Sequence, residues 1–177
     1  MTIDLNCDVG EGMNNEHLLM PYISSCNIAC GGHYGDSKTI DKAVQVALEK
    51  NVFIGAHPSF PDKENFGRYL LKISNNDLAD SLRWQLDLFC NILDKKAIKL
   101  HHIKPHGALY NAIAKDENLA NIFLEIIKPY FSKECVLYVP FKSKIERVAK
   151  SNQIKVKYEA FADRSYNADL SLLSRNQ

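Results

Sequence analysis

Histidine, carboxylate and lysine side chains follow five short apolar runs of this 177-residue chain. These residue types could carry out hydrolysis in either of two ways. Two or three histidines together with Asp8 could hold a divalent metal ion that keeps one position open for water. Alternatively, carboxylates could act as general base on water, while Lys104 and the imidazoles stabilise an oxyanion. Spacing alone does not choose between the two. In chain order, the candidate residues are Asn6, Asp8, Glu11, Asn27, His33, Asp36, His57, Asp62, Arg68, Lys104, His106, Glu159, Asp163 and Arg164.

The elements that must position these side chains alternate between short apolar runs and segments of helical period. The runs predict strands near residues 3–9, 23–29, 52–56, 99–103, 135–139 and 154–161. Apolar spacing of three and four residues predicts helices near 37–48, 78–93, 119–127 and 144–150, with Asp36 or Ser37, Ser74 and Ser143 as N-caps. Such alternation predicts parallel β/α units, which form an open sheet or a barrel.

In a parallel barrel the carboxyl ends of the strands converge on one face, and nearly all the candidate residues follow predicted strands. The sequence has no G-x-G-x-x-G after the first run and no Walker loop, which argues against a dinucleotide domain and against ATP binding by that motif. It also lacks a nucleophile elbow and an H-E-x-x-H motif. We expect His101 and His102 to be structural, because one of two successive strand residues must face the packed side.

Composition narrows the class of protein. The chain carries 22 Lys and Arg against 21 Asp and Glu, a balance that argues against nucleic acid as the main partner. No apolar run is long enough for a membrane helix, and the N-terminus does not resemble a signal peptide. The five cysteines form no C-x-x-C pair, and we read Cys26 and Cys30 as small core residues. Reduced thiols and a cytoplasmic location follow as expectations.

Several long motifs resemble the LamB/YcsF family, and the resemblance covers essentially the whole chain. They include Asp-Leu-Asn-Cys-Asp-Val-Gly-Glu at 4–11, Asn-Ile-Ala-Cys-Gly-Gly-His at 27–33, Gly-Ala-His-Pro at 55–58, Phe-Gly-Arg at 66–68, Lys-Pro-His-Gly-Ala-Leu-Tyr-Asn at 104–111 and Glu-Ala-Phe-Ala-Asp-Arg at 159–164. The resemblance implies one domain over 1–177, a distorted β/α barrel of the glycoside hydrolase/deacetylase type. It also implies ATP-dependent opening of 5-oxoproline to L-glutamate, together with subunits B and C of a 5-oxoprolinase.

The resemblance also suggests roles for individual residues. Fold analogy implies a metal at Asp8, His33 and His57. Glu11 or Asp8 is the expected base. Lys104, His106 and Arg164 are expected to bind the substrate carboxylate or the activated oxygen, and an arginine fork suits a carboxylate. Substrate contacts are expected from Asn6, Asn27, Arg68 and Glu159 as well. ATP would be handled with the partner subunits, which would activate the lactam by phosphorylating its amide oxygen.

Chains of this family continue well past Gln177, and the part beyond it includes a last strand and helix. We therefore expect a barrel that is incomplete at its C-terminus, with an open seam beside the first strand that self-association could cover. Two alternatives follow. A truncated homologue could be an inactive binding or structural subunit of the same complex. The barrel type and the histidines would also allow a metal-dependent deacetylase acting on saccharides.

Overall fold

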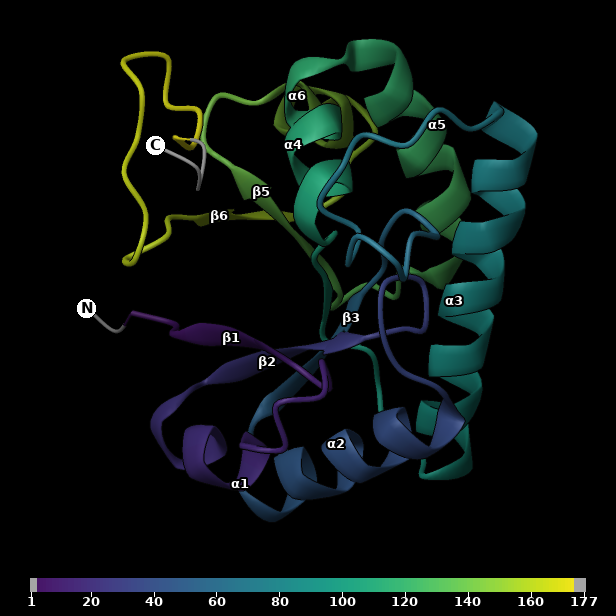
Figure 1. Cartoon of the computed structure of the whole chain (residues 1–177), viewed down its shortest axis with the longest axis vertical. Coiled ribbons are helices and arrows are strands. Elements are labelled where there is room, and N and C mark those ends of the chain that lie inside the picture. Colours follow the sequence, from purple (N-terminus) through teal and green to yellow (C-terminus); the bar gives the residue numbers. More distant parts are fainter. Residues whose placement is uncertain (1–2, 174–177) are drawn as a thin grey trace.

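The computed structural model describes residues 3–173, so the expectation tied to Gln177 lies outside the described residues. Six parallel strands form one curled sheet in chain order, and each strand pairs with the next (Figure 1). This order confirms the predicted succession of β/α units. The strands are β1 (Asn6–Val9), β2 (Ser25–Ala29), β3 (Phe53–His57), β4 (His102–Ile103), β5 (Val136–Pro140) and β6 (Val156–Glu159).

Helices cover the outer face of the sheet (Figure 1). Three helices begin where the sequence predicts, because the side chains of Asp36, Ser74 and Ser143 each accept a backbone N–H of the first turn. Two helices, α1 and α4, are absent from the prediction. The first is a single turn, and neither has a side-chain N-cap. The helices are α1 (Glu16–Leu19), α2 (Ser37–Glu49), α3 (Asn75–Lys95), α4 (Gly107–Lys115), α5 (Glu117–Ile127) and α6 (Lys144–Ser151), with 3-10 turns at Met20–Tyr22 and Lys128–Tyr130.

The two faces of the sheet differ in polarity. On β2, Cys26 and Ile28 are buried in the apolar core between sheet and helices, whereas Ser25 and Asn27 make polar contacts on the concave face. The same alternation continues on β4, where Ile103 belongs to the apolar core and His102 bonds Asn27. Because successive side chains of a strand point to opposite faces, every second residue of these strands faces a polar interior. The positions of the reactive side chains follow from this alternation.

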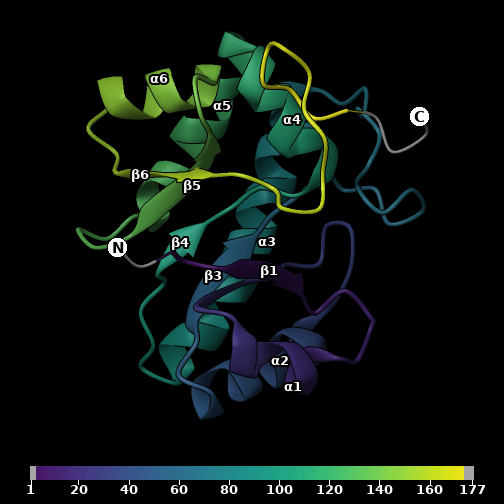
Figure 2. The same cartoon turned by 90° about the vertical axis from the view of Figure 1, so that its left-hand side faces the viewer.

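The edges of the sheet, β1 and β6, lie on the open side of the curl (Figures 1 and 2). Within residues 3–173 no strand pairs with the free edge of either. Side chains bridge the two instead. The Asp4 carboxylate accepts hydrogen bonds from the hydroxyl groups of Ser25 (2.8 Å) and Tyr138 (2.7 Å), and from Nζ of Lys157 at 2.5 Å. This cluster connects the chain before β1 to both β5 and β6.

None of the helices in this stretch of the chain combines the length and the apolar character needed to cross a membrane.

Candidate active site

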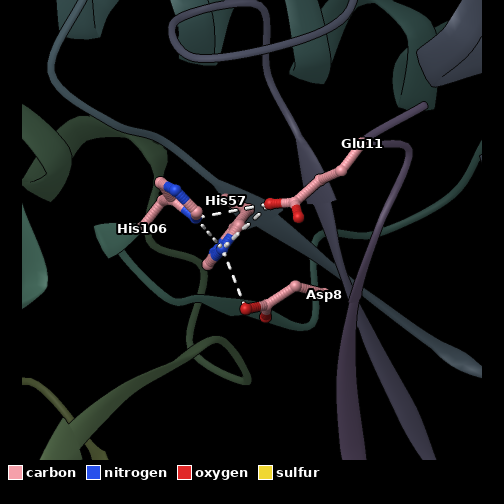
Figure 3. A group of neighbouring side chains, drawn as sticks. All are labelled: Asp8, Glu11, His57 and His106. Carbon is pink, nitrogen blue, oxygen red and sulfur yellow. Dashed lines mark hydrogen bonds and ion pairs between the residues drawn. The ribbon is translucent and has the colours of Figure 1, made fainter. Parts of the chain in front are cut away.

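Four side chains from the carboxyl ends of three strands, β1, β3 and β4, converge on one point (Figure 3). Asp8 lies on β1, Glu11 follows β1, His57 ends β3 and His106 precedes α4. Each offers one nitrogen or oxygen atom, and these four atoms lie within 4.8 Å of one another. His57 Nε2 lies 3.4 Å from Asp8 Oδ2, and His106 Nδ1 lies 3.3 Å from Glu11 Oε1. This set has the donor chemistry of a transition-metal or zinc site.

The hydrogen bonds of the two rings fix where their protons lie. His57 Nδ1 lies 2.6 Å from the Lys104 carbonyl, and His106 Nε2 lies 2.9 Å from the Phe66 carbonyl. Because a carbonyl oxygen only accepts, these two nitrogens carry protons. In the neutral rings, the free lone pairs of His57 Nε2 and His106 Nδ1 therefore face each other at 3.0 Å. Such an arrangement requires a proton or a cation between the two nitrogens.

Burial sets the charge of the surrounding groups. Burial and the neighbouring His57 lower the pKa of His106 to about 3, so this ring is neutral near neutral pH. For the Glu11 carboxyl group, burial acts in the opposite direction and raises the pKa above its ordinary value. His57 and His106 act to lower this pKa but do not offset burial. A carboxylate with a raised pKa is a better proton acceptor than an ordinary one, which is the property of a general base.

His33 lies beside the cluster and not within it. Its ring stacks on that of His106 at a centroid distance of 3.7 Å, and its Nε2 lies 2.8 Å from Glu11 Oε1. Burial lowers the pKa of His33 to about 3. The neutral ring donates to Glu11 through Nε2, so it orients that carboxylate. The structure thus brings Asp8 and His57 of the expected metal set together with Glu11 and His106, while His33 lies behind Glu11.

The loop after β3 positions the His106 ring. Gly67 has φ +61, and a Cβ atom there would lie 3.0 Å from the Cβ of His33 and 3.1 Å from Cδ2 of His106. The Gly67 carbonyl also accepts the backbone N–H of Ala108 in α4. A side chain at this position would be strained and would push against both rings. Gly67 therefore allows the close approach of this loop to the start of α4.

Lys104 is a buried cation between two carboxylates. Its Nζ donates to Asp8 Oδ1 at 3.1 Å and to Glu159 Oε1 at 2.7 Å. Burial acts to lower the pKa of Lys104, but Asp8 and Glu159 raise it by more, so the ammonium stays charged. Burial acts to raise the pKa of Asp8, but His57 and Lys104 hold it well below its ordinary value. Protein atoms surround Asp8 closely, yet 32% of its side chain is accessible, because its carboxylate faces the cavity.

Asn6 and Asn27, two expected substrate contacts, lie behind Asp8. The Asn27 amide nitrogen donates to Asp8 Oδ1 at 2.8 Å and to Asn6 Oδ1 at 2.6 Å. Asn27 is fully buried, and neither asparagine lines the cavity at the site. Glu159 also differs from the expected position, because its side chain is 5% accessible and is paired with Lys104. These three residues contact the reactive groups from behind the cavity wall.

A cavity of about 690 Å³ opens in front of the cluster. Arg68 and Arg164, both expected from the sequence, lie in its wall, and the Arg68 guanidinium lies 5.0 Å from the centre of the Phe66 ring. Sequence reasoning missed Phe66, Tyr110 and Phe161. The only signal for Tyr110 is its position one helical turn after His106. The wall consists of Asp8, Glu11, His57, Glu64, Asn65, Phe66, Arg68, Tyr69, Lys104, Pro105, His106, Gly107, Tyr110, Asn111, Phe161, Arg164, Leu172 and Leu173.

This chain is similar to known proteins along nearly all its length. It is 42% identical over 175 residues to the A subunit of 5-oxoprolinase from Haemophilus influenzae strain PittEE, covering 99% of this chain and 71% of the relative. It is 38% identical over 182 residues to the corresponding 5-oxoprolinase chain of Pyrococcus abyssi, again covering 71% of that protein. The crystal structure of a lactam utilization protein from Thermus thermophilus superimposes with a TM-score of 0.91 at 32% identity, covering 99% of this chain and 73% of that one.

The comparisons agree with the curled β/α sheet and with the motifs that carry the resemblance. The model of the LamB/YcsF family matches residues 3–177. This chain therefore belongs to the LamB/YcsF family.

Proposed function

We propose that this chain is the A subunit of a 5-oxoprolinase, which hydrolyses the lactam of 5-oxo-L-proline to L-glutamate. One observation carries the chemistry: two carboxylates, two imidazole lone pairs and a buried ammonium converge at the floor of one open cavity. The relatives, both named for the A subunit of 5-oxoprolinase, support the substrate. They do not favour a saccharide deacetylase or an inactive subunit.

Hydrolysis needs a base, an oxyanion partner and a proton for the leaving nitrogen. Glu11 takes a proton from water, whose oxygen then bonds to the lactam carbonyl carbon. Lys104, a buried cation 3.1 Å from Asp8, stabilises the negative charge on the former carbonyl oxygen, or on the phosphoryl group that this oxygen carries in the ATP-dependent reaction. When the ring C–N bond breaks, Glu11 returns its proton to the nitrogen. The second water proton, left on the new carboxyl group, passes to the amine. The products are the carboxylate and the ammonium group of glutamate, so atoms and charges balance.

Arg68 and Arg164 are proposed to bind the carboxylate of 5-oxoproline at the mouth of the cavity. Both line it, and the guanidinium fork can bond both oxygens of a carboxylate. The Arg68 guanidinium lies over the Phe66 ring, and this cation–π contact favours its position beside the cavity. This arrangement would place the lactam ring between the arginines and the cluster around Glu11.

We further propose that the cluster holds a divalent metal ion. Asp8, His57 and His106 would be its ligands, with Glu11 beside them, and the facing lone pairs of the two rings fit that role. When bound, such an ion supplies Lewis-acid polarisation of an oxygen atom. His33 would orient Glu11 and would not be a ligand, which departs from the set implied by fold analogy.

ATP coupling is proposed to depend on partner subunits B and C. An unstrained five-membered lactam resists attack by water, and phosphorylation of its amide oxygen would make the ring carbon electrophilic. ATP would transfer its γ-phosphoryl group to that oxygen and leave as ADP, and this chain would then direct water onto the activated ring carbon. Cleavage of the C–N bond would leave the phosphoryl group on the new carboxyl oxygen, and a second water would release inorganic phosphate and glutamate. A cytoplasmic complex is the expected setting.

The test is ATP-dependent conversion of 5-oxoproline to glutamate by this chain mixed with subunits B and C. We expect turnover in the mixture, none from this chain alone without ATP, and loss of turnover with His57→Ala. His17→Ala is the matched control, because His17 is exposed and lies outside the site. An inactive mixture in which a longer relative is active would refute the proposed activity for this chain. Robust turnover without ATP would refute the division of labour within the complex.

A further inference from the structure

A row of hydrogen bonds runs through the concave face of the sheet and ends at Asp8. The Asp8 carboxylate can only accept, so the NH₂ group of Asn27 must face it. The Asn27 carbonyl oxygen consequently faces His102, whose Nε2 lies 2.7 Å away. His102 Nε2 therefore carries a proton and donates it to Asn27.

His102 is held in place from three sides. Its ring stacks on Tyr138 at a centroid distance of 4.2 Å and an angle of 9°. Its Nδ1 lies 2.9 Å from Nδ1 of His101. On the third side lies Gly55, where a Cβ atom would come within 2.1 Å of His102 Nε2. The ring is completely buried and has no contact with the cavity, so its polar contacts are all within the protein.

We infer that His102 is a positioning residue for the proposed hydrolysis, acting on Asp8 through Asn27. By fixing the Asn27 carbonyl, it commits both amide hydrogens to Asp8 and Asn6. With Oδ1 held by Asn27 and Lys104, the other oxygen of Asp8 points to His57 at 3.4 Å. Without His102 the buried Asn27 carbonyl oxygen loses its donor, and only the bonds to Asp8 and Asn6 hold the amide in place.

This inference rests on the proposed function for its kinetic consequences but not for its geometry. Partners that orient a reactive or ligating group typically matter by about 10–100-fold in activity or affinity. Asn27 orients the Asp8 carboxylate, and His102 orients Asn27 in turn. Effects of His102 and Asn27 should therefore not add, because the two act as one unit.

The experiment compares His102→Leu, His102→Gln and Tyr138→Phe in the complex with subunits B and C. His102→Leu removes the donor to Asn27, whereas the Gln amide keeps a donor of similar reach. Tyr138→Phe keeps the ring that stacks on His102 but removes a partly buried hydrogen bond to Asp4, so it controls for loss of stability. Melting temperatures are measured for all three variants.

We expect His102→Leu to lower kcat about 10–100-fold with KM changed by less than about twofold, His102→Gln to recover most of the loss, and Tyr138→Phe to keep its kcat. Adding His102→Leu to Asn27→Ala should cause no further loss. A kcat for His102→Leu equal to that of Tyr138→Phe, or a fully additive double variant, would overturn the inference.

Crystal structures of the variants give a readout that does not depend on turnover. In His102→Leu the Asp8 carboxylate should leave its position beside His57 Nε2, and in His102→Gln it should keep it. An unchanged Asp8 in His102→Leu would overturn the inference even if the complex is active. An inactive wild-type complex would instead refute the proposed function, while the crystal structures would still decide the role of His102.

Discussion

The rings of His57 and His106 meet with two nitrogens 3.0 Å apart, and each ring donates its other N–H to a backbone carbonyl. Neither ring can donate to the other while both are neutral. The two nitrogens can therefore share a proton or a metal cation. The carboxylates of Asp8 and Glu11 lie beside them in the same cluster.

Titration with Zn²⁺ should show one tight site per chain, because four potential ligand atoms already lie within 4.8 Å. His57→Ala should weaken binding by about 100-fold or more, since loss of an outer partner alone costs about 10–100-fold. Isothermal titration calorimetry measures both, and His17→Ala should bind like the wild type. If Zn²⁺ produces no heat of binding and activity survives a chelator, a proton and not a metal ion lies between His57 Nε2 and His106 Nδ1.

Lys104→Met should lower the free energy of unfolding by about 3–5 kcal/mol, because it leaves the Asp8 and Glu159 carboxylates without their buried cation. Urea denaturation measures the change. The control is Lys99→Met, since the Lys99–Glu134 pair is exposed and should contribute less than about 1 kcal/mol. Equal effects of the two substitutions would contradict the view that burial makes the Lys104 pairs important.

Arg68→Ala should raise KM for 5-oxoproline about 10-fold or more while changing kcat little, because a charged hydrogen bond to the substrate carboxylate is worth about 1.5–3 kcal/mol. Steady-state kinetics of the complex separate the two constants. Arg83→Ala removes an exposed arginine of α3 outside the cavity and should leave both unchanged. If kcat falls and KM does not, Arg68 contacts the reacting centre and not the carboxylate.

Asp4→Asn should lower the free energy of unfolding near neutral pH and have a smaller effect in acid, where the Asp4 carboxyl group is protonated. Burial acts to raise the pKa of Asp4, but hydrogen bonds from Lys157, Tyr138 and Ser25 lower it by more. A lowered carboxyl pKa stabilises the folded state above the unfolded value of about 3.8, and this stabilisation is lost as pH falls through the folded pKa. Urea denaturation at pH 7 and near pH 3 should show a difference from wild type that shrinks at the lower pH. A difference that does not change with pH would mean that the cluster acts through shape alone.

Much of the architecture could be predicted because local signals dominate it. Apolar runs gave the strands, and the caps Asp36, Ser74 and Ser143 gave three helix starts. The short β4 and the helix α4 were harder. Only two residues of β4 pair as strand, and α4 begins at Gly107 after His106, whose side chain does not cap the helix.

That the site residues lie together could be predicted from one rule, namely that the carboxyl ends of parallel strands converge on one face. Which histidines face each other could not. The place of His106 depends on the left-handed Gly67 and on the Phe66 carbonyl, both from a loop 40 residues away. Likewise, nothing local distinguishes Asn27, which points at another side chain, from an asparagine that points at a ligand. Such choices arise from contacts between distant segments.

The neighbour-to-neighbour order of the six strands has a consequence for how the chain folds. Each strand finds its partner in the unit that precedes or follows it, so the sheet can grow one unit at a time from the N-terminus as the chain is synthesised. Among the described residues, the hydrogen bonds that span the greatest separations are side-chain bonds, Lys157 to Asp4 and Tyr138 to Asp4. A growing chain would therefore acquire its backbone framework early and become chemically competent only after Glu159 has arrived to pair with Lys104.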